Sequence, residues 1–311
     1  MSGQTSNLVM VLSGPTASGK SALGLEIASQ LPAVLINADS MQLYEGLACL
    51  TASPASDDFA RASHRLYHHF PYDFQGNSVA LWQEMALKEI ERAHECRHLP
   101  IILGGTGFYL KTLIQGICDI PPVSPTAKET FLKQMEPVST PDLYHRLQQV
   151  DPALATTLSP GDRQRICRGL LVYQATEKSL STWQQETSSP LPYPFVHINF
   201  APPRDVLRDQ IQRRFETGWD TMVEEVKSFL KRPGATSSPL VQAAGFKEIE
   251  AHIKGHLKEA EAKNRAITRI QQYAKRQTTW FRHQLPKDLS IETPDPKKAL
   301  SELMSFLGNH L

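Results

Sequence analysis

One stretch of the chain decides the fold: Gly14-Pro15-Thr16-Ala17-Ser18-Gly19-Lys20-Ser21. It matches G-x-x-x-x-G-K-[ST], the P-loop that cradles phosphates. The apolar run before it, residues 8–12, predicts a buried strand, and residues 21–31 carry apolar side chains at helical spacing. In a strand–loop–helix unit, backbone N–H groups and a helix N-terminus point at one anion. The sequence therefore predicts a phosphate site in which Lys20 adds a charge and Ser21 is placed to hold Mg²⁺.

The first third of the chain continues this alternation of strand and helix. The pattern predicts strands over 33–37, 65–70 and 100–103, the second of them weakly, and helices over 79–94 and 108–114. A second glycine-rich turn, residues 104–107, is expected to lie beside the first. The fold class predicted is therefore α/β, with a P-loop NTPase-like parallel sheet flanked by helices.

The organisation changes near residue 121. Residues 126–176 show helical segments separated by prolines and no strand pattern, and a Ser- and Pro-rich loop follows over 187–194. The alternating residues 195–200 return the chain to the sheet, and the remainder has helical patterns over 205–215, 219–231, 238–253 and 257–283. We expect a P-loop catalytic core over 1–120 and 195–311, with basic C-terminal helices, and an all-helical insertion domain over 121–194.

Bulk properties limit the kind of protein. The 311 residues are 41% hydrophobic and 21% charged, and the formal net charge is +1, so any basic surface must be local. The four cysteines are scattered without a C-x-x-C pair, which argues against a zinc site or a disulfide framework. The sequence shows neither a signal peptide pattern nor an apolar run long enough to cross a membrane. We expect a cytoplasmic protein with no membrane partner.

One local basic surface is predicted near the C-terminus. Residues 254–287 hold nine cations against two acids, with Tyr273, Trp280 and Phe281 interleaved; the cations are Lys254, Lys258, Lys263, Arg265, Arg269, Lys275, Arg276, Arg282 and Lys287. Cations beside aromatic rings suit single-stranded or looped nucleic acid. The alternative is a solvated helix face whose aromatic residues pack on the sheet. A second basic group, Arg163, Arg165 and Arg168, lies in the insertion and favours an extended polyanion.

Six motifs together resemble one family, the tRNA dimethylallyltransferases (tRNA isopentenyltransferases) of bacterial type. They span nearly the whole chain in the family's order, at residues 14–21, 36–44, 104–110, 162–170, 243–248 and 272–282. The resemblance implies transfer of a dimethylallyl group from dimethylallyl diphosphate to the exocyclic N6 amine of a tRNA adenosine. That base is at tRNA position 37, immediately 3′ to the anticodon. It also implies that the P-loop holds this diphosphate with Mg²⁺, that the insertion binds tRNA, and that the protein's RNA partner is the anticodon stem-loop.

The reaction requires stabilisation of a leaving diphosphate. Positive charge develops on the allylic carbon as the diphosphate departs, so its oxygens need fixed cations. Residues 14–21 with Lys20 are expected to supply them, and the resemblance adds Arg214, although Arg213 is adjacent. From the residues alone, a helix-surface charge is the favoured explanation of both arginines.

The attacking amine requires a proton acceptor. Asp39 follows a predicted strand near the P-loop, and its carboxylate would accept a hydrogen bond from the amine and take the proton as the nitrogen becomes cationic. Asp39 could instead cap a helix or bind magnesium, and the residues alone do not decide between these roles.

The resemblance also implies a set of tRNA contacts. They are Asp39, Ser40, Met41, Gln42, Thr106, Gln164, Arg165, Ile166, Cys167, Arg168, Lys275, Arg276, Gln277, Trp280 and Arg282, with Lys128 aligned more loosely. Stacking of a base on Trp280 or Phe281 is a hypothesis beside the alternative that these rings pack in the core. Ser53 stands where many relatives carry a lysine, which puts one phosphate or tRNA contact in doubt.

Two alternatives remain to the prenyltransferase, which is expected to act as a monomer. The first is a P-loop kinase of a small molecule or nucleotide, which would have little use for the insertion and the basic helix. The second is a non-catalytic RNA-binding protein, against which the intact Gly14, Gly19, Lys20, Ser21 and Asp39 argue.

Overall fold

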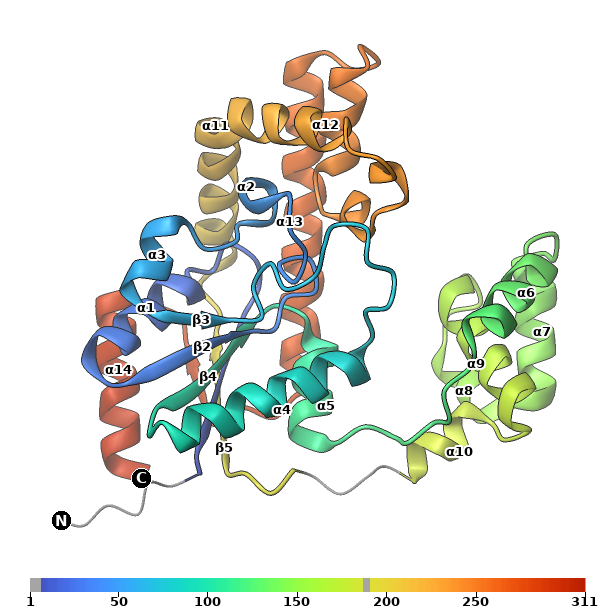
Figure 1. Cartoon of the computed structure of the whole chain (residues 1–311), viewed down its shortest axis with the longest axis horizontal. Helices are drawn as coiled ribbons and strands as arrows, with labels where there is room; N and C mark the ends of the chain where they lie inside the picture. The colour runs from blue at the N-terminus through green and yellow to red at the C-terminus, as the bar shows by residue number, and fades with distance from the viewer. Residues whose placement is uncertain (1–6, 187–190, 311) are drawn as a thin grey trace. The chain divides into compact units, whose positions relative to one another are not determined.

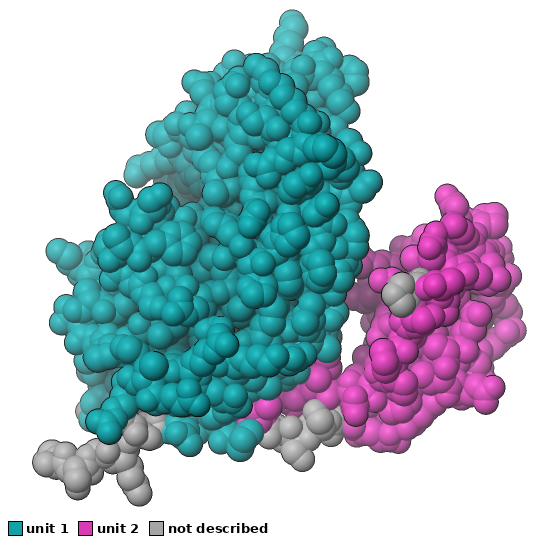
Figure 2. Space-filling view, viewed as in Figure 1, with its two compact units in different colours: residues 1–114, 192–311 teal, residues 115–191 magenta. Residues whose placement is uncertain are grey.

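The chain folds into two compact units. The structure, a computed structural model, describes residues 7–186 and 191–310. One unit comprises residues 1–114 and 192–311, and the other comprises residues 115–191 (Figure 2). The insertion thus begins and ends a few residues earlier than the 121–194 expected from the sequence. Residues 187–190 of the predicted Ser- and Pro-rich loop lie outside the described residues.

The first unit is built on a six-stranded parallel sheet in the order β3-β2-β4-β1-β5-β6 (Figure 1). The strands are β1 (Val9–Ser13), β2 (Ala33–Asn37), β3 (Ser63–Arg65), β4 (Leu99–Gly104), β5 (Phe195–Phe200) and β6 (Leu289–Ile291). The two central strands, β4 and β1, pair with Ser13 opposite Gly104. Both glycine-rich loops therefore leave the same edge of the sheet from neighbouring strands, as predicted.

Side-chain alternation along the strands buries both faces of this sheet. Met10, Leu12 and Leu35 join one core with Leu23 of α1 (Lys20–Gln30) and Leu303 of α14 (Pro296–His310). The intervening residues point to the opposite face, which α4 (Val79–Glu95) covers through contacts with β2 and β4. A parallel sheet buried on both faces is the α/β architecture predicted from the alternation of strands and helices.

The other helices of the first unit lie around the P-loop edge of the sheet or beyond it. They are α2 (Ala48–Thr51), α3 (Ser56–Arg61), α5 (Gly107–Gln115), α11 (Arg204–Phe229), α12 (Phe246–Ile253) and α13 (Glu259–Gln284), with 3₁₀ helices η1 (Ala235–Ser237) and η2 (Pro239–Gln242). The long helices α11 and α13 contact each other, and both contact α12. These helices bring residues from the C-terminal third of the chain to the phosphate loop.

The structure corrects the weak strand predicted over 65–70. The strand β3 ends at Arg65, where the prediction began. Leu66 and His68 have positive φ angles of 62° and 48°, which an extended strand does not allow. The chain therefore turns at these residues instead of continuing the sheet.

Three predictions in the C-terminal third were also wrong. Residues 205–215 and 219–231 form one helix, α11, because buried Phe215, Trp219 and Met222 keep the helical spacing across Gly218. The pattern over 238–253 is split into η2 and α12, because Gly245 adopts a left-handed φ of 96°. The strand β6 was missed, since its three residues are too few to show a period.

The second unit is helical throughout its described residues. Its helices are α6 (Pro125–Met135), α7 (Thr140–Val150), α8 (Pro152–Thr157), α9 (Arg163–Thr176) and α10 (Leu180–Gln185). Leu143, Leu147 and Ile166 are fully buried in a core of its own. Three of these helices begin with proline within the first two helical positions after a Ser or Asp cap, so Pro125, Pro141 and Pro152 start helices here.

Candidate active site

The P-loop folds tightly over the end of β1. Gly19 has a left-handed φ of 92° immediately before α1, a conformation that glycine adopts without steric cost. A Cβ on Gly14 would lie 2.3 Å from the carbonyl oxygen of Phe200, so only glycine fits there. These two positions let the backbone N–H groups of the loop converge on one space.

A buried hydroxyl within the loop lacks a partner. Ser18 is fully buried, and its Oγ has no hydrogen bond among the residues that the structure describes. An unpaired buried hydroxyl costs free energy unless a ligand supplies the bond. An anion held by the loop would do so, and the loop therefore fits a phosphate group.

Lys20 is the cation of this loop. Its Nζ donates a hydrogen bond to Pro15 O at 3.2 Å. Burial lowers the pKa of Lys20 from 10.5 to about 8; Arg214 lowers it as well, whereas Asp39 opposes the shift. These electrostatic effects place Lys20, Asp39 and Arg214 in one neighbourhood, although they come from residues far apart in the sequence.

Asp39 is oriented by the turn that follows β2. The Asn37 side chain accepts a hydrogen bond from Asp39 N at 2.8 Å and donates one to Asp39 O at 3.0 Å. One carboxylate oxygen, Oδ1, accepts from Met41 N at 3.0 Å in a turn that does not continue into an α-helix. The other oxygen, Oδ2, has no hydrogen bond within the described chain and is available to a substrate. Sequence reasoning did not single out Asn37, although it lies two residues before Asp39.

Arg214, and not Arg213, faces the site. Arg213 is exposed, while the Arg214 side chain bonds the carbonyl oxygens of Cys49 at 3.0 Å and Leu50 at 2.5 Å. Glu225, on the same helix, accepts hydrogen bonds from the backbone N–H groups of Cys49 and Leu50, both at 2.9 Å. The pair fixes α2 against α11, and Arg214 is therefore not a free helix-surface charge. These contacts of Arg214 and Glu225 with the backbone of α2 were not predicted, because so short a helix gives no periodic signal in the sequence.

The second glycine loop packs directly on the Asp39 turn. The hydroxyl of Thr106 accepts a hydrogen bond from Ser40 N at 3.0 Å. A Cβ on Gly104 would lie 2.2 Å from Ala38 O, which requires glycine at this crossing. Thr106 and Ser40 therefore lie together near Asp39. The Gln42 side chain does not join this group, because it donates hydrogen bonds to Thr51 O and Ala52 O, each at 2.9 Å.

Gln277 departs from its predicted role as a tRNA contact. Its side chain is buried, with 6% of its surface exposed. Its Oε1 accepts from Thr16 N and its Nε2 donates to Gly105 O, both at 2.8 Å. Both ends of the amide are thus used to tie α13 to the two glycine loops. Gln277 is a structural link and offers no exposed group to RNA.

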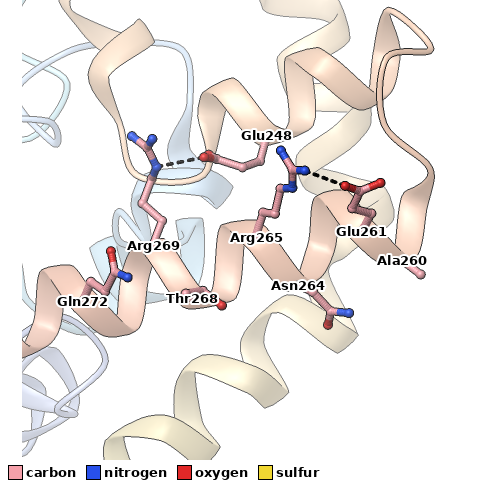
Figure 3. A pocket seen from close by; sticks show the side chains of 8 residues that line it. All are labelled: Glu248, Ala260, Glu261, Asn264, Arg265, Thr268, Arg269 and Gln272. Carbon is pink, nitrogen blue, oxygen red and sulfur yellow. Dashed lines mark hydrogen bonds and ion pairs between the residues drawn. The ribbon is translucent and has the colours of Figure 1, made fainter.

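The basic charge of α13 is concentrated in its second half. Arg265 pairs with Glu261 at 2.6 Å and Arg269 with Glu248 at 2.8 Å, beside a surface cavity of about 630 Å³ (Figure 3). Lys263 and Lys254 are also paired, with Glu259 and Glu250. Among the described residues, no ion pair is formed by the remaining cations of the stretch, which are Lys258, Lys275, Arg276, Arg282 and Lys287.

A larger cavity, of about 750 Å³, lies between the start of α11 and the second half of α13. Lys275, Arg282 and Lys287 of the predicted basic surface line it, together with two cations that the sequence did not single out, Arg204 and Arg208, against one acid, Glu292. Arg276 is exposed on the same helix. Unpaired cations around a groove suit a phosphate backbone.

The aromatic residues of α13 divide between core and site. Phe281 is buried, with 1% of its surface exposed, so the core-packing alternative holds for this ring. Trp280 is half-buried and lies against Gly107, where an added Cβ would come within 2.2 Å of the indole. The Trp280 ring therefore covers the start of α5.

In the second unit the predicted contacts also divide. Gln164, Arg165 and Arg168 are exposed on α9, and Lys128 is exposed on α6. Ile166 and Cys167 were expected to contact tRNA, but their side chains are buried in the unit's core and cannot do so.

Arg163 does not belong to the exposed basic group either. Its guanidinium donates to the carbonyl oxygens of Met135, Glu136 and Val138, and so satisfies the end of α6. Of the three arginines predicted as a second basic surface, Arg163 is therefore used to hold α6 and α9 together.

Oxygen ligands suited to Mg²⁺ lie around the P-loop. The described residues hold no cluster of three His, Cys, Asp or Glu side chains that would bind a metal by themselves. Mg²⁺ commonly uses one or two protein oxygens together with waters and phosphates. The exposed hydroxyl of Ser21 and the Asp39 carboxylate fit that pattern.

Comparison with known proteins identifies the family. The model of a family described as IPP transferase matches residues 42–284, which is most of the chain. The chain belongs to the IPP transferase family. A "tRNA dimethylallyltransferase" of Rhodospirillum centenum is 40% identical over 283 residues, covering 89% of each chain. Another of the same name, from Azorhizobium caulinodans, is 38% identical over 303 residues and covers 96% of each chain.

Solved structures agree with this assignment to the IPP transferase family. A "tRNA isopentenylpyrophosphate transferase" from Bacillus halodurans has a TM-score of 0.69 at 28% identity, covering 97% of this chain and 96% of its own. A eukaryotic dimethylallyltransferase, described as acting on tRNA, has a TM-score of 0.80 and covers 98% of this chain and 80% of its own. At 23% identity the latter likeness supports the fold alone.

Membership of the IPP transferase family makes this chain a transferase and favours prenyl transfer over the P-loop kinase alternative. Within the described residues, no helix is both long enough and apolar enough to cross a membrane.

Proposed function

We propose that this protein transfers a dimethylallyl group from dimethylallyl diphosphate to the exocyclic N6 amine of adenosine at position 37 of tRNA, 3′ to the anticodon. The products are N6-dimethylallyladenosine and diphosphate. The observation that carries the proposal is the shared neighbourhood of Lys20, Asp39 and Arg214. A phosphate-binding loop there meets a carboxylate with a free oxygen, which is the pair of groups that prenyl transfer to an amine requires.

The phosphate side of the reaction is the breaking of the C1–O bond. Positive charge grows on the allylic carbon, and negative charge grows on the leaving diphosphate. Lys20, the loop N–H groups and the free nitrogens of Arg214 stabilise that negative charge from fixed positions, without reorganisation of solvent. Mg²⁺, held by Ser21 and the diphosphate, would add further positive charge to the leaving group.

The amine side is the formation of the N6–C1 bond. The adenine amine is a weak nucleophile because its lone pair is delocalised into the ring. Asp39 Oδ2 accepts a hydrogen bond from N6–H, which orients the amine, and takes that proton as the nitrogen becomes cationic. The Asn37 bonds to the backbone of Asp39 hold the carboxylate for this step.

The RNA must present a single base to this site. Enzymes that modify a base take it out of the stack, at a cost of a few kcal/mol. The unpaired cations Lys275, Arg276 and Arg282 support binding of the anticodon stem-loop along α13, and the exposed Gln164, Arg165 and Arg168 support binding by the insertion. Since one chain supplies all these groups, we propose that it acts as a monomer. We also propose that it acts in the cytoplasm, where a tRNA substrate would be met.

The test uses two reactions on one RNA. Purified protein, Mg²⁺ and an anticodon stem-loop with adenosine 3′ to the anticodon are mixed with labelled dimethylallyl diphosphate or with γ-labelled ATP. We expect label on the RNA only in the first reaction. The same stem-loop with guanosine at that position is the matched control and should stay unlabelled. Consumption of ATP without prenylated RNA would overturn the proposal in favour of the kinase alternative.

A further inference from the structure

A tyrosine that this mechanism does not use is held beside Asp39. Tyr67 lies in the segment that follows β3, between two residues with left-handed backbone, Leu66 (φ 62°) and His68 (φ 48°). Residues other than glycine rarely adopt this conformation, and such strain persists only where surrounding contacts determine it. The backbone on both sides of Tyr67 is therefore under constraint.

The constraint comes from the turn that carries Asp39. Asn37 Nδ2 donates hydrogen bonds to Leu66 O at 2.9 Å and to Asp39 O at 3.0 Å. On the other side of Tyr67, His68 N donates to Gln42 O at 2.9 Å. The same side chain thus positions Asp39 and the residue before Tyr67, so the two functional groups share one support.

The side chain of Tyr67 is packed on one side and unpaired at its tip. Its ring makes edge-to-face contacts with His64, at 5.3 Å between centroids, and with Phe59, at 6.3 Å. Within the described part of the chain, the hydroxyl has no hydrogen-bond partner. Burial, and then the negative charge of Asp39, raise its pKa above the ordinary value. The phenol therefore stays neutral and keeps a proton to donate.

A free donor beside a free acceptor matches one face of adenine. Adenine presents N6–H as a donor and N1 as the adjacent acceptor on its Watson–Crick edge, whereas guanine presents O6 as an acceptor and N1–H as a donor. We propose that Tyr67 donates a hydrogen bond to N1 of the acceptor adenine while Asp39 accepts one from its N6 amine. Tyr67 is then a specificity-determining residue, and this inference rests on the proposed function.

Two other tyrosines are affected by the charge of Asp39, Tyr109 and Tyr273. The Tyr109 hydroxyl is already bonded to the Asn77 side chain, so Tyr273 is the one that competes for this role. Tyr273 of α13 is also affected by the charge of Asp39, and its hydroxyl too is unpaired within the described residues. Its ring lies beneath Arg276, at 5.9 Å, and its backbone is not tied to the Asp39 turn. Tyr67 is favoured because Asn37 fixes it relative to Asp39.

The test removes the donor and the acceptor of the proposed Tyr67–N1 hydrogen bond separately, the donor by substitution and the acceptor by a base analogue. Wild type, Tyr67→Phe, Tyr273→Phe and Tyr72→Phe are assayed on stem-loops carrying adenosine or 1-deazaadenosine, which lacks N1, at the target position. We expect 1-deazaadenosine to lower the wild-type kcat/KM about tenfold, as loss of one hydrogen bond would. The Tyr67→Phe substitution should lower kcat/KM on adenosine by about the same factor. Replacing adenosine with 1-deazaadenosine should not lower the kcat/KM of this variant any further.

The controls separate specificity from folding and from the proposed function. The Tyr72 hydroxyl donates to Pro233 O on the surface, so Tyr72→Phe should keep the full sensitivity to 1-deazaadenosine. Thermal melting of each variant reports folding, and wild-type transfer to adenosine alone reports the proposed function. A wild-type rate unaffected by 1-deazaadenosine, a Tyr67→Phe variant that keeps the sensitivity, or loss of the sensitivity in Tyr273→Phe would overturn the inference.

Discussion

At the scale of single residues, the proposed chemistry depends on one carboxylate oxygen of Asp39. Oδ1 accepts the hydrogen bond that holds the turn, and Oδ2 has no hydrogen bond among the described residues. Asp39→Asn keeps the turn-forming oxygen but cannot take a proton, so transfer should slow at least about a hundredfold. Single-turnover rates measure this effect, and RNA affinity should remain near the wild-type value. An unchanged rate would remove Asp39 from the mechanism.

The lowered pKa of Lys20 leads us to expect that diphosphate binding depends on pH. Burial lowers its pKa to about 8, so the free protein carries the charge below that pH and loses it above. Because the folded value lies below the ordinary 10.5, keeping Lys20 charged costs the ligand-free fold some stability at neutral pH. That cost begins to fall as the pH rises through about 8, and it is gone only above about 10.5, where Lys20 is neutral in the folded and the unfolded chain alike.

An anion binds the charged form of Lys20. Affinity for dimethylallyl diphosphate, followed by calorimetry, should therefore be steady near neutral pH and fall as the pH rises through about 8. Lys20→Arg keeps its charge throughout and corrects for ionisation of the ligand itself, so this variant should not show the fall. An identical pH profile in both proteins would contradict the assignment.

The positions of the P-loop and of Asp39 in the fold were easier to predict from the sequence than the residues that support them. The P-loop and Asp39 follow strands with strong apolar runs, and the carboxyl ends of parallel strands meet at one edge. Asn37 and Glu225 could not be predicted, because each acts through bonds to backbone groups that only the folded chain brings near. The choice between Arg213 and Arg214 also needed the structure, since adjacent helical residues point in different directions.

At the scale of elements, α13 is joined to the phosphate site by Gln277. Gln277→Ala leaves Thr16 N and Gly105 O without their partners. Two lost hydrogen bonds at a buried position should lower the free energy of unfolding by about 2–4 kcal/mol. Chemical denaturation measures this change, and KM for the diphosphate substrate should rise as the loop loosens.

The neighbouring Gln272 provides the control for this prediction. It is exposed on the same helix, so Gln272→Ala should change stability little. Equal losses in both variants would mean that helix propensity, and not the bridge, explains the effect.

Periodicity decided which elements were predictable. The buried strands β1, β2 and β4 and the helix α4 were found because their apolar spacing is regular over their whole length. Apolar spacing gave the wrong boundaries where a break in the backbone does not coincide with a break in the spacing. The gap predicted between residues 215 and 219 does not exist, because buried residues on both sides of it continue α11. Gly245 ends the helical pattern that was predicted to run from 238 to 253. The prolines of the insertion were predicted only to separate helices, and Pro125, Pro141 and Pro152 lie at helix starts because each follows a capping residue.

At the scale of the whole molecule, charge alone does not mark the RNA surface. Lys275 and Arg276 are exposed and unpaired in the described chain, whereas Lys254 and Arg265 are paired with Glu250 and Glu261. Neutralising Lys275 and Arg276 to Gln should weaken RNA binding and reduce the slope of log K against log salt by roughly 1 to 2. Filter binding over a range of salt concentrations measures the slope.

The matched variant carries the same change in charge at a different place. Lys254→Gln with Arg265→Gln removes two charges that already face carboxylates, so its salt slope should stay near that of the wild type. Equal slopes for the two double variants would mean that the second half of α13 is not the RNA surface.

The second unit has a core of its own, which predicts independent folding. Residues 115–191 produced alone should show a helical circular dichroism spectrum and a cooperative thermal transition. Leu147 is fully buried in that core, so Leu147→Ala should cost about 2–5 kcal/mol. A fragment without a cooperative transition would show that the unit depends on the rest of the chain.

Gln277 lies one residue after Arg276 and two after Lys275, so one turn of α13 carries both the bridge to the P-loop and the cations that would meet RNA. If binding at the P-loop or at the two cations makes this turn more rigid, the other site loses less conformational entropy when its own ligand binds. Linkage then requires each substrate to raise the affinity for the other by the same factor. Dimethylallyl diphosphate should therefore bind the RNA-loaded protein more tightly than the free protein, and RNA should bind the diphosphate-loaded protein more tightly by the same factor.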